Sequence, residues 1–218
     1  MKSLSDKEEI IDSIRKGLKN ALFKEINQTE FDNSKIYQTP SKPLIDIFKD
    51  ELTRINGEFI YCENNGQIVE AIKTIHQKYN LALCYSPDPR FKYVVDNLKI
   101  DYTEKFEKTD EIKSGISACE FLVARFGSVV VSSALPGGRR IFSFPEIHIV
   151  IASESQLVME LEEALNGLRL RYGTGLPSQI INIAGPSRTA DIEKTLILGA
   201  HGPKMLFVIV NKNEIGNQ

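Results

Sequence analysis

The chain has 218 residues, of which 42% are hydrophobic and 26% charged, a balance typical of a globular protein that buries a core. Its formal net charge of −2 gives no electrostatic reason to expect nucleic acid or an anionic membrane as a partner. No apolar run approaches the ~20 residues of a membrane span, and the polar segment 1–9 is unlike a signal peptide. We therefore expect a cytoplasmic protein without a membrane span.

The cysteines and histidines give no sign of a metal or cluster site. Three cysteines are widely spaced along the chain: Cys62, Cys84 and Cys119. Without a C-x-x-C pair they predict neither an iron–sulfur cradle nor a zinc site, and we expect free thiols that behave as small buried apolar residues. The three histidines are not spaced as a ligand set either. No metal and no cofactor are therefore expected in this chain.

The N-terminal segment is predicted to be a helical arm. A capping box at 5–8 precedes apolar residues at helical spacing, which predicts a helix from about Asp6 to Phe23. Polar residues follow as far as Lys42. We expect 1–42 to form an arm and linker that folds back on the body or reaches another subunit, and 43–211 to form one α/β domain.

The first half of that domain alternates between helical and extended patterns. Helices are expected over 44–56, 67–79 and 91–98, and strands over 58–61 and 81–85. Such alternation predicts parallel strands joined by crossover helices.

The second half is predicted to contain a β-hairpin and further strands. The hairpin joins 121–124 to 128–132, and strands are expected over 147–152, 179–184 and 205–210. A second capping box at 153–156 is expected to open a helix with Leu157, Leu161, Leu165 and Leu168 on one face. A short helix is also expected over 189–198.

The stretch 185–193 is the strongest candidate for a functional turn. Gly185 follows an apolar run, and Ser187 or Thr189 can cap a helix that begins there. A helix start exposes N–H donors, and Arg188 would add a fork of donors for phosphate or carboxylate. The same residues are equally well explained as caps and salt-bridge partners without a ligand, so both interpretations stay open.

Other turns add candidates of the same kind. Arg139 belongs to a Pro-Gly-Gly-Arg-Arg turn that resembles an anion-binding loop. The complete set of candidate ligand-binding residues is Gly185, Ser187, Arg188, Thr189, Arg139, Gly127 and Ser128. The candidates for acid–base chemistry are His201, Asp191 and Glu193.

Together these segments resemble a known family. The run GPSRTADIE at 185–193, followed by LILGAHGPK at 196–204, resembles the C-terminal signature of the LUD domain family, in its lactate-utilisation protein C (LutC/YkgG-like) branch. The two arginines at 139–140, the P-x-I-H-I-V strand at 145–150 and Gln-Leu-Val at 156–158 agree in order and spacing. The resemblance extends over 115–210.

The resemblance implies a fold and a process. The fold is the NagB/RpiA/CoA-transferase-like α/β fold, with a mostly parallel sheet, the central hairpin and the N-terminal helical arm. The process is oxidation of L-lactate to pyruvate, in which this chain would be an accessory or ligand-binding subunit for a small anion. Iron–sulfur clusters would then lie on partner subunits.

Two further hypotheses stay open, and whether the chain is itself an enzyme stays open with them. One is a stand-alone enzyme of the same superfamily that acts on a phosphorylated or CoA/folate-like anionic substrate. The other is a structural interaction module that assembles through its N-terminal helix, for which a homo-oligomer is one form.

One position departs from the family pattern. Many relatives carry a Glu-Thr-Gly-Thr-like run in the central hairpin, where this chain has Arg125, Phe126, Gly127 and Ser128. A cation thus replaces a carboxylate. If that glutamate acts in acid–base or nucleophilic catalysis in relatives, we expect this chain to lack that role or to bind a more anionic ligand. We therefore assign no catalytic glutamate to this chain.

Overall fold

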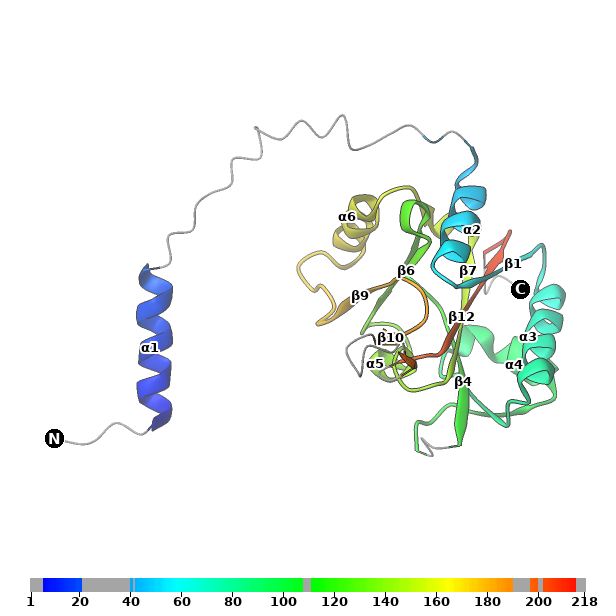
Figure 1. The fold of residues 1–218 in the computed structure, drawn as a ribbon, viewed down its shortest axis with the longest axis horizontal. Helices are drawn as coiled ribbons and strands as arrows, with labels where there is room; N and C mark the ends of the chain where they lie inside the picture. The colour runs from blue at the N-terminus through cyan, green and yellow to red at the C-terminus, as the bar shows by residue number, and fades with distance from the viewer. Residues whose placement is uncertain are drawn as a thin grey trace. The chain divides into compact units, whose positions relative to one another are not determined.

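The computed structural model describes residues 6–20, 40, 42–107, 111–189, 197–199 and 202–214. The chain divides into two compact units, 1–39 and 40–218. In the first unit, helix α1 spans Asp6–Asn20 (Figure 1). Ile10 and Ile14 on this helix are exposed. Helix α1 confirms the predicted helix over 6–20, while 21–23 lie outside the described residues.

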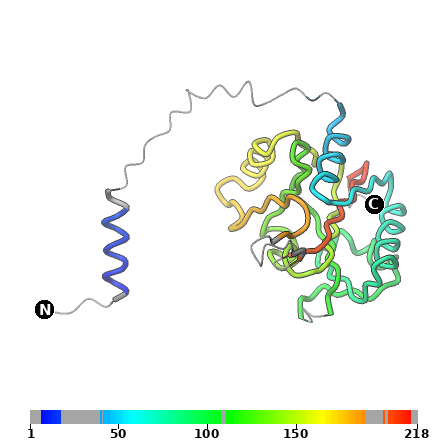
Figure 2. Tube along the Cα trace, viewed as in Figure 1, coloured from blue at the N-terminus to red at the C-terminus, as the bar shows by residue number. Residues whose placement is uncertain are grey.

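The second unit is built on a six-stranded sheet in which every neighbouring pair of strands is parallel. Figure 1 draws its strands as arrows, and Figure 2 traces the path of the chain through it. Its order is β1-β12-β7-β4-β2-β3. The strands in that order are Glu58–Cys62, Met205–Asn211, Ile147–Ser153, Ile112–Ser117, Leu83–Tyr85 and Asp101–Thr103. The mostly parallel sheet predicted from the alternating pattern is confirmed.

Side chains that alternate along the central strands form two separate cores. On β7, Ile147, Ile149 and Ile151 face helices α3 (Asn65–Tyr79) and α4 (Lys92–Leu98). Val150 and Ala152 face the opposite way, toward α2 (Leu44–Arg54) and the second sheet. Because each fully buried aliphatic side chain contributes about 1.5–3 kcal/mol, this strand with both faces buried is a principal source of stability.

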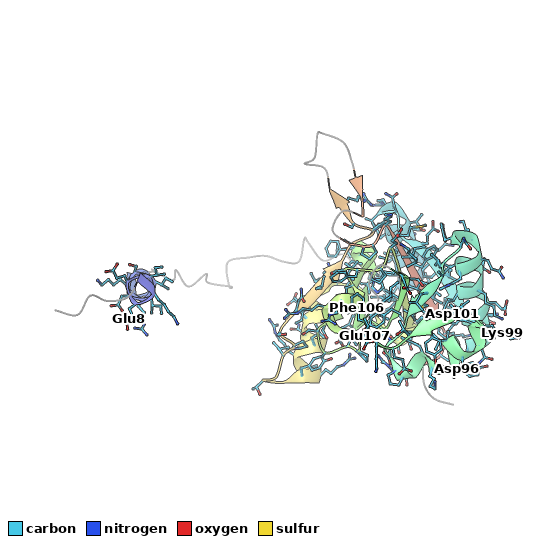
Figure 3. The ribbon with its side chains drawn as sticks, turned by 90° about the horizontal axis from the view of Figure 1, so that it is seen from below. Glu8, Asp96, Lys99, Asp101, Phe106 and Glu107 are labelled. Atoms are coloured by element: carbon cyan, nitrogen blue, oxygen red, sulfur yellow. The ribbon has the colours of Figure 1, made fainter. Side chains whose placement is uncertain are left out.

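A four-stranded sheet with the order β8-β5-β6-β9 packs against the parallel one. Its strands in that order are Leu157–Val158, Phe121–Val123, Ser128–Ser132 and Ile180–Ile183. Strands β5 and β6 form the predicted antiparallel hairpin, joined by a 3-10 turn over Ala124–Phe126. Helix α6 (Leu161–Tyr172) covers the outer face, and Figure 3 shows this sheet on one side of the molecule and α3 and α4 on the other.

Gly127 fixes the contact between the hairpin and α2. Its φ is +57°, and a Cβ at this position would lie 2.0 Å from the backbone nitrogen of Leu52. The short helix α5 (Gly138–Ile141) follows β6 and places Ile141 in the same core.

None of the described helices combines the length and the hydropathy that crossing a bilayer requires.

The helix expected to open at 153–156 begins later than predicted. The capping box between Ser153 and Gln156 is present, but it closes a 3-10 turn over Glu154–Gln156. Leu157 then pairs with Leu122 in the second sheet, so it cannot lie on the helix. Helix α6 starts at Leu161 with its own capping box.

The short helix expected over 189–198 is wrong at both of its described ends. Strand β10 (Arg188–Thr189) pairs antiparallel with β11 (Ile197–Leu198), as Figure 3 shows where these two strands stand out from the body. Residues 190–196 lie outside the described part of the chain. Because these two segments pair as antiparallel strands, no helix begins at Ser187 or Thr189. The free N–H groups that a helix start would expose are therefore not formed there.

Candidate functional site

A cleft of about 410 Å³ lies where four strands of the parallel sheet end. Arg90 follows β2, Ala118 and Cys119 follow β4, Ser153 ends β7, and Glu214 lies beyond β12. In open parallel α/β sheets, ligands bind outside the carboxyl ends of the strands. The position therefore marks this cleft as the candidate site.

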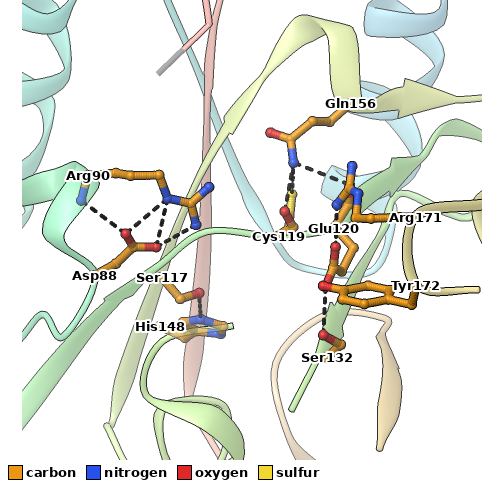
Figure 4. Close-up of polar contacts among 10 residues, drawn as sticks. All are labelled: Asp88, Arg90, Ser117, Cys119, Glu120, Ser132, His148, Gln156, Arg171 and Tyr172. Atoms are coloured by element: carbon orange, nitrogen blue, oxygen red, sulfur yellow. Dashed lines mark hydrogen bonds and ion pairs between the residues drawn. The ribbon is translucent and has the colours of Figure 1, made fainter. Parts of the chain in front are cut away.

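One wall of the cleft forms where the chain leaves the parallel sheet twice, from β4 into β5 and from β7 into β8. Gln156 joins the two crossings. Its Oε1 accepts from the backbone nitrogen of Ser153 at 2.8 Å. Its Nε2 donates to the carbonyl oxygens of Cys119 at 2.7 Å and Glu120 at 3.2 Å (Figure 4). The predicted capping box thus holds this wall in place.

Glu120 is a completely buried carboxylate in that wall. Its Oε1 accepts from the Ser132 hydroxyl at 2.6 Å and the Tyr172 hydroxyl at 2.7 Å, and its Oε2 accepts from Nη1 of Arg171. Three donors, one of them charged, offset the cost of burying the carboxylate. Burial and the hydrogen bond to Glu120 raise the pKa of Tyr172, so its phenol stays protonated and donates.

Arg171 is held by the buried Glu120 and extends into the cleft. Its side chain is 48% exposed, whereas that of Glu120 is 0% exposed. The guanidinium also lies over the ring of Phe121, 5.3 Å from its centroid. Because the guanidinium is bound to Glu120 and stacked on Phe121, it has few orientations available. This restriction reduces the side-chain entropy that is lost when a ligand binds.

Arg90 is held in the same way on the other side of the cleft (Figure 4). The side chain of Asp88 is 2% exposed and caps the 3-10 helix Pro89–Phe91. Asp88 also accepts from Nε of Arg90 at 2.9 and 3.1 Å and from Nη2 at 2.5 Å, and this pairing raises the pKa of Arg90. Within the described part of the chain, Nη1 of Arg90 has no hydrogen-bond partner, and the side chain is 45% exposed.

The arrangement can orient an anion. Two guanidinium groups face one cleft, and each is fixed by a carboxylate that solvent does not reach. Arginine's planar fork of donors matches carboxylate and phosphate oxygens. Each arginine is already paired with a negative charge, so the site would recognise a ligand through directed hydrogen bonds more than through net charge.

The other polar groups of this region are less suited to chemistry. Burial, followed by the nearby Glu120 charge, raises the pKa of the Cys119 thiol, so it is a poor nucleophile. His148 shares a 2.7 Å hydrogen bond with Ser117, and burial lowers its pKa to about 4, so it is neutral at pH 7. All three cysteines are free and buried, as predicted. Among the described residues, no three His, Cys, Asp or Glu side chains gather as a metal site.

Comparison with known proteins identifies the family to which this fold and cleft belong. The model of the LUD domain matches residues 45–210. The chain belongs to the LUD domain family. The resemblance found in the sequence motifs is thereby confirmed.

Several relatives of this LUD domain bear one name. Lactate utilization protein C of Shouchella clausii is 34% identical over 184 residues, covering 77% of this chain and 79% of the relative. The proteins of the same name from Halalkalibacterium halodurans and Bacillus subtilis are 28% and 27% identical, covering 78% and 82% of this chain and 80% and 73% of the relatives. A DUF162 family protein from Deinococcus radiodurans has the same fold, with a TM-score of 0.57 at 16% identity, covering 77% of this chain and 96% of that one.

The turn predicted to bind a ligand lies at the opposite edge of the LUD domain's sheet. A Cβ on Gly185 would lie 2.5 Å from the carbonyl oxygen of Ile55, and Arg188 donates to the same oxygen. The backbone nitrogen of Ser187 donates to the carbonyl of Pro203 at 2.8 Å. Ile55 precedes β1 and Pro203 precedes β12, so these residues lie at the amino ends of the strands. The structure gives each of them a contact within the fold.

None of the remaining predicted ligand-binding residues lines the cleft. Arg139 is exposed and donates to the Ser178 hydroxyl at 3.1 Å. Gly127 and Ser128 are buried in the hairpin, and Thr189 is part of β10. The acid–base candidates lie outside the described residues: His201, Asp191 and Glu193.

Arg125, at the position where we expect a departure from the family pattern, is paired with an acidic neighbour. Its Nε donates to both carboxylate oxygens of Glu160, at 2.6 and 2.7 Å. Glu160 also caps the first turn of α6. Arg125 therefore joins the hairpin to α6, and it is not among the residues that line the cleft.

Sequence reasoning missed the residues that shape the cleft, although a signal was present. Asp88 and Arg90 come a few residues after the buried strand β2, and Glu120 comes shortly after β4 in an otherwise apolar stretch. Charged residues that close buried strands of a parallel sheet are candidates for its ligand-binding edge. Arg171 carried no comparable signal, because a basic residue is ordinary in the last turn of a helix.

Proposed function

We propose that this LUD domain acts in lactate utilisation as a subunit that binds a small anionic ligand in the cleft between Arg90 and Arg171. The observation that carries the proposal is the pair of guanidinium groups, each held by a buried carboxylate at the carboxyl ends of the strands. The process is supported by relatives named lactate utilization protein C that cover most of both chains.

The binding step can be tested with L-lactate and pyruvate as probes. A ligand that binds only the native state raises the unfolding free energy by RT ln(1 + [L]/Kd), about 2.7 kcal/mol at a concentration of 100 Kd. We expect the melting temperature of the full-length chain to rise with the concentration of either acid, and sodium chloride at equal ionic strength to give no such rise. A melting curve unchanged by both acids, up to the highest concentration that can be reached, would contradict binding of L-lactate and pyruvate.

We further propose that the chain works in the cytoplasm with iron–sulfur subunits that oxidise L-lactate to pyruvate, as an accessory subunit. The tagged full-length chain, purified anaerobically from its own host, should carry partner subunits with the visible absorption of iron–sulfur clusters. If the isolated chain oxidised L-lactate with a simple electron acceptor, the accessory role would be wrong.

The size of the cleft favours a second candidate. Its 410 Å³ exceeds what lactate fills and lies within the roughly 300–1,000 Å³ of pockets that hold larger ligands. A stand-alone enzyme acting on a phosphorylated or CoA/folate-like anion would use that space. Thermal-shift screening separates the two: stabilisation by phosphorylated metabolites or CoA esters, with none by L-lactate or pyruvate, would favour the enzyme.

A further inference from the structure

The charges around the cleft restrict the kind of anion that it can hold. Arg90 and Arg171 supply two positive charges. Asp88 and Glu120 pair with them, and Glu214 adds another carboxylate to the lining. The lining residues and the carboxylates paired with its arginines thus hold three carboxylates and two guanidinium groups, a formal charge of −1. A ligand with several negative charges would meet carboxylates that are closely paired with the same arginines.

The donors that remain suit a single carboxylate. Asp88 takes Nε and Nη2 of Arg90, and Glu120 takes Nη1 of Arg171, which leaves part of each fork for a ligand. One carboxylate has two acceptor oxygens and can satisfy two such donors. A phosphate or a CoA pyrophosphate would bring more charge than these partly occupied forks can match.

The rest of the lining is uncharged and wider than a lactate molecule needs. Phe121 and Leu135 are partly exposed on the cleft, beside the polar side chains of Ser155 and Gln156. A ligand body of carbon atoms with few hydroxyl groups can pack on the first two and hydrogen-bond to the others. Each additional buried CH₂ strengthens binding by about 0.8 kcal/mol, close to fourfold in affinity.

We infer that the ligand of this cleft is a monocarboxylate whose uncharged body is larger than that of lactate. This inference rests on the proposed anion-binding function and narrows its substrate class. Recognition then needs one carboxylate between Arg90 and Arg171 and an uncharged body on Phe121 and Leu135, and Glu214 repels additional negative charge.

The test is isothermal titration of the full-length chain with three acids: L-lactate, 3-phenyl-L-lactate and phosphoenolpyruvate. Phenyllactate has the head group of lactate and a larger uncharged body, whereas phosphoenolpyruvate is compact and carries several charges. We expect phenyllactate to bind at least tenfold more tightly than either of the others. Lactate or phosphoenolpyruvate binding as tightly as phenyllactate would overturn this inference while leaving an anion-binding cleft in place. Binding of none of the acids would remove the proposed function as well.

A matched pair of variants tests the role assigned to Glu214. Glu214→Gln removes the carboxylate at the cleft, and Glu58→Gln removes an exposed carboxylate at the amino end of β1. We expect Glu214→Gln to raise the affinity for phosphoenolpyruvate at least twofold more than that for phenyllactate, and Glu58→Gln to change neither. Equal effects of the two variants would contradict repulsion by Glu214.

Discussion

Replacing Glu120 by glutamine tests whether the buried carboxylate holds the arginine wall of the cleft. Glu120 accepts from Ser132 and Tyr172 on one oxygen and from Arg171 on the other. Glutamine keeps the shape and one acceptor oxygen. Its amide nitrogen would replace the oxygen that faces the guanidinium, so two donors would meet.

The expected cost follows from the burial of the two partners. A lost hydrogen bond to a charged group costs about 1.5–3 kcal/mol, and removing one partner of a fully buried ion pair costs about 3–5 kcal/mol. The lower range applies because the Arg171 side chain is 48% exposed and can turn toward water. We expect Glu120→Gln to lower the unfolding free energy by about 2–3 kcal/mol, which lowers Tm by roughly 4–12 °C.

The assay is urea unfolding of the full-length chain, with Glu146→Gln as the control. Glu146 bridges Lys113 and Lys204, each at 2.9 Å, but all three side chains are more than 40% exposed. Its loss should cost less than about 1 kcal/mol, because water screens exposed pairs. If Glu120→Gln lowered the unfolding free energy no more than Glu146→Gln, at an unchanged m value, the reasoning about the buried network would be refuted.

Three further predictions follow from single positions. Burial lowers the pKa of His148 to about 4, below its ordinary value of about 6.5, so in that interval the unfolded chain binds a proton that the native chain does not. The contribution of neutral His148 to the unfolding free energy should therefore be fully present above pH 7 and fall by up to about 3 kcal/mol between pH 6.5 and 4. Urea unfolding at each pH should show that the His148→Gln variant lacks this part of the pH dependence. Gly127→Ala should lower the unfolding free energy by about 3 kcal/mol or more, because the added Cβ would overlap the backbone of α2. Gly138 also has a positive φ, but the nearest neighbour of its added Cβ is 4.0 Å away, so Gly138→Ala should cost about 1 kcal/mol. Equal losses of stability in thermal melting of the two variants would contradict the overlap. Arg188→Ala removes a hydrogen bond to the end of α2 and should cost less than about 1.5 kcal/mol by the same assay, and a larger loss would show that more than this contact depends on it.

The parts of the fold that sequence predicts best are those where one local pattern has one structural outcome. The short runs at 147–152, apolar apart from His148, and at 205–210 are rich in Ile and Val, which favours buried strands, and they are the centre of the parallel sheet. Leu157 shows the opposite case. Its spacing from Leu161 fits a helix, but its pairing with Leu122 decides the structure, and that partner is distant in the sequence.

The candidate site depended on distant contacts even more. Ser187 and Arg188 have the composition of a ligand-binding turn, yet the structure joins them to Pro203 and Ile55. Arg90 follows β2 and Arg171 lies at the end of α6, so they share a cleft only because the fold brings these distant segments to the same end of the sheet. Turn chemistry is readable locally, but which turns share a cleft is a property of the topology.

The most direct test of the account compares the affinity of one ligand across arginine variants at the two edges of the sheet. Isothermal titration of 3-phenyl-L-lactate, or of L-lactate if that binds more tightly, would be carried out on the wild type, Arg90→Gln, Arg171→Gln and Arg188→Gln. Loss of one charge-assisted contact should weaken binding at least tenfold in each of the first two variants. Arg188→Gln should bind as the wild type does. Affinity that falls in Arg188→Gln and survives in both cleft variants would place the site at the amino ends of the strands and contradict the account.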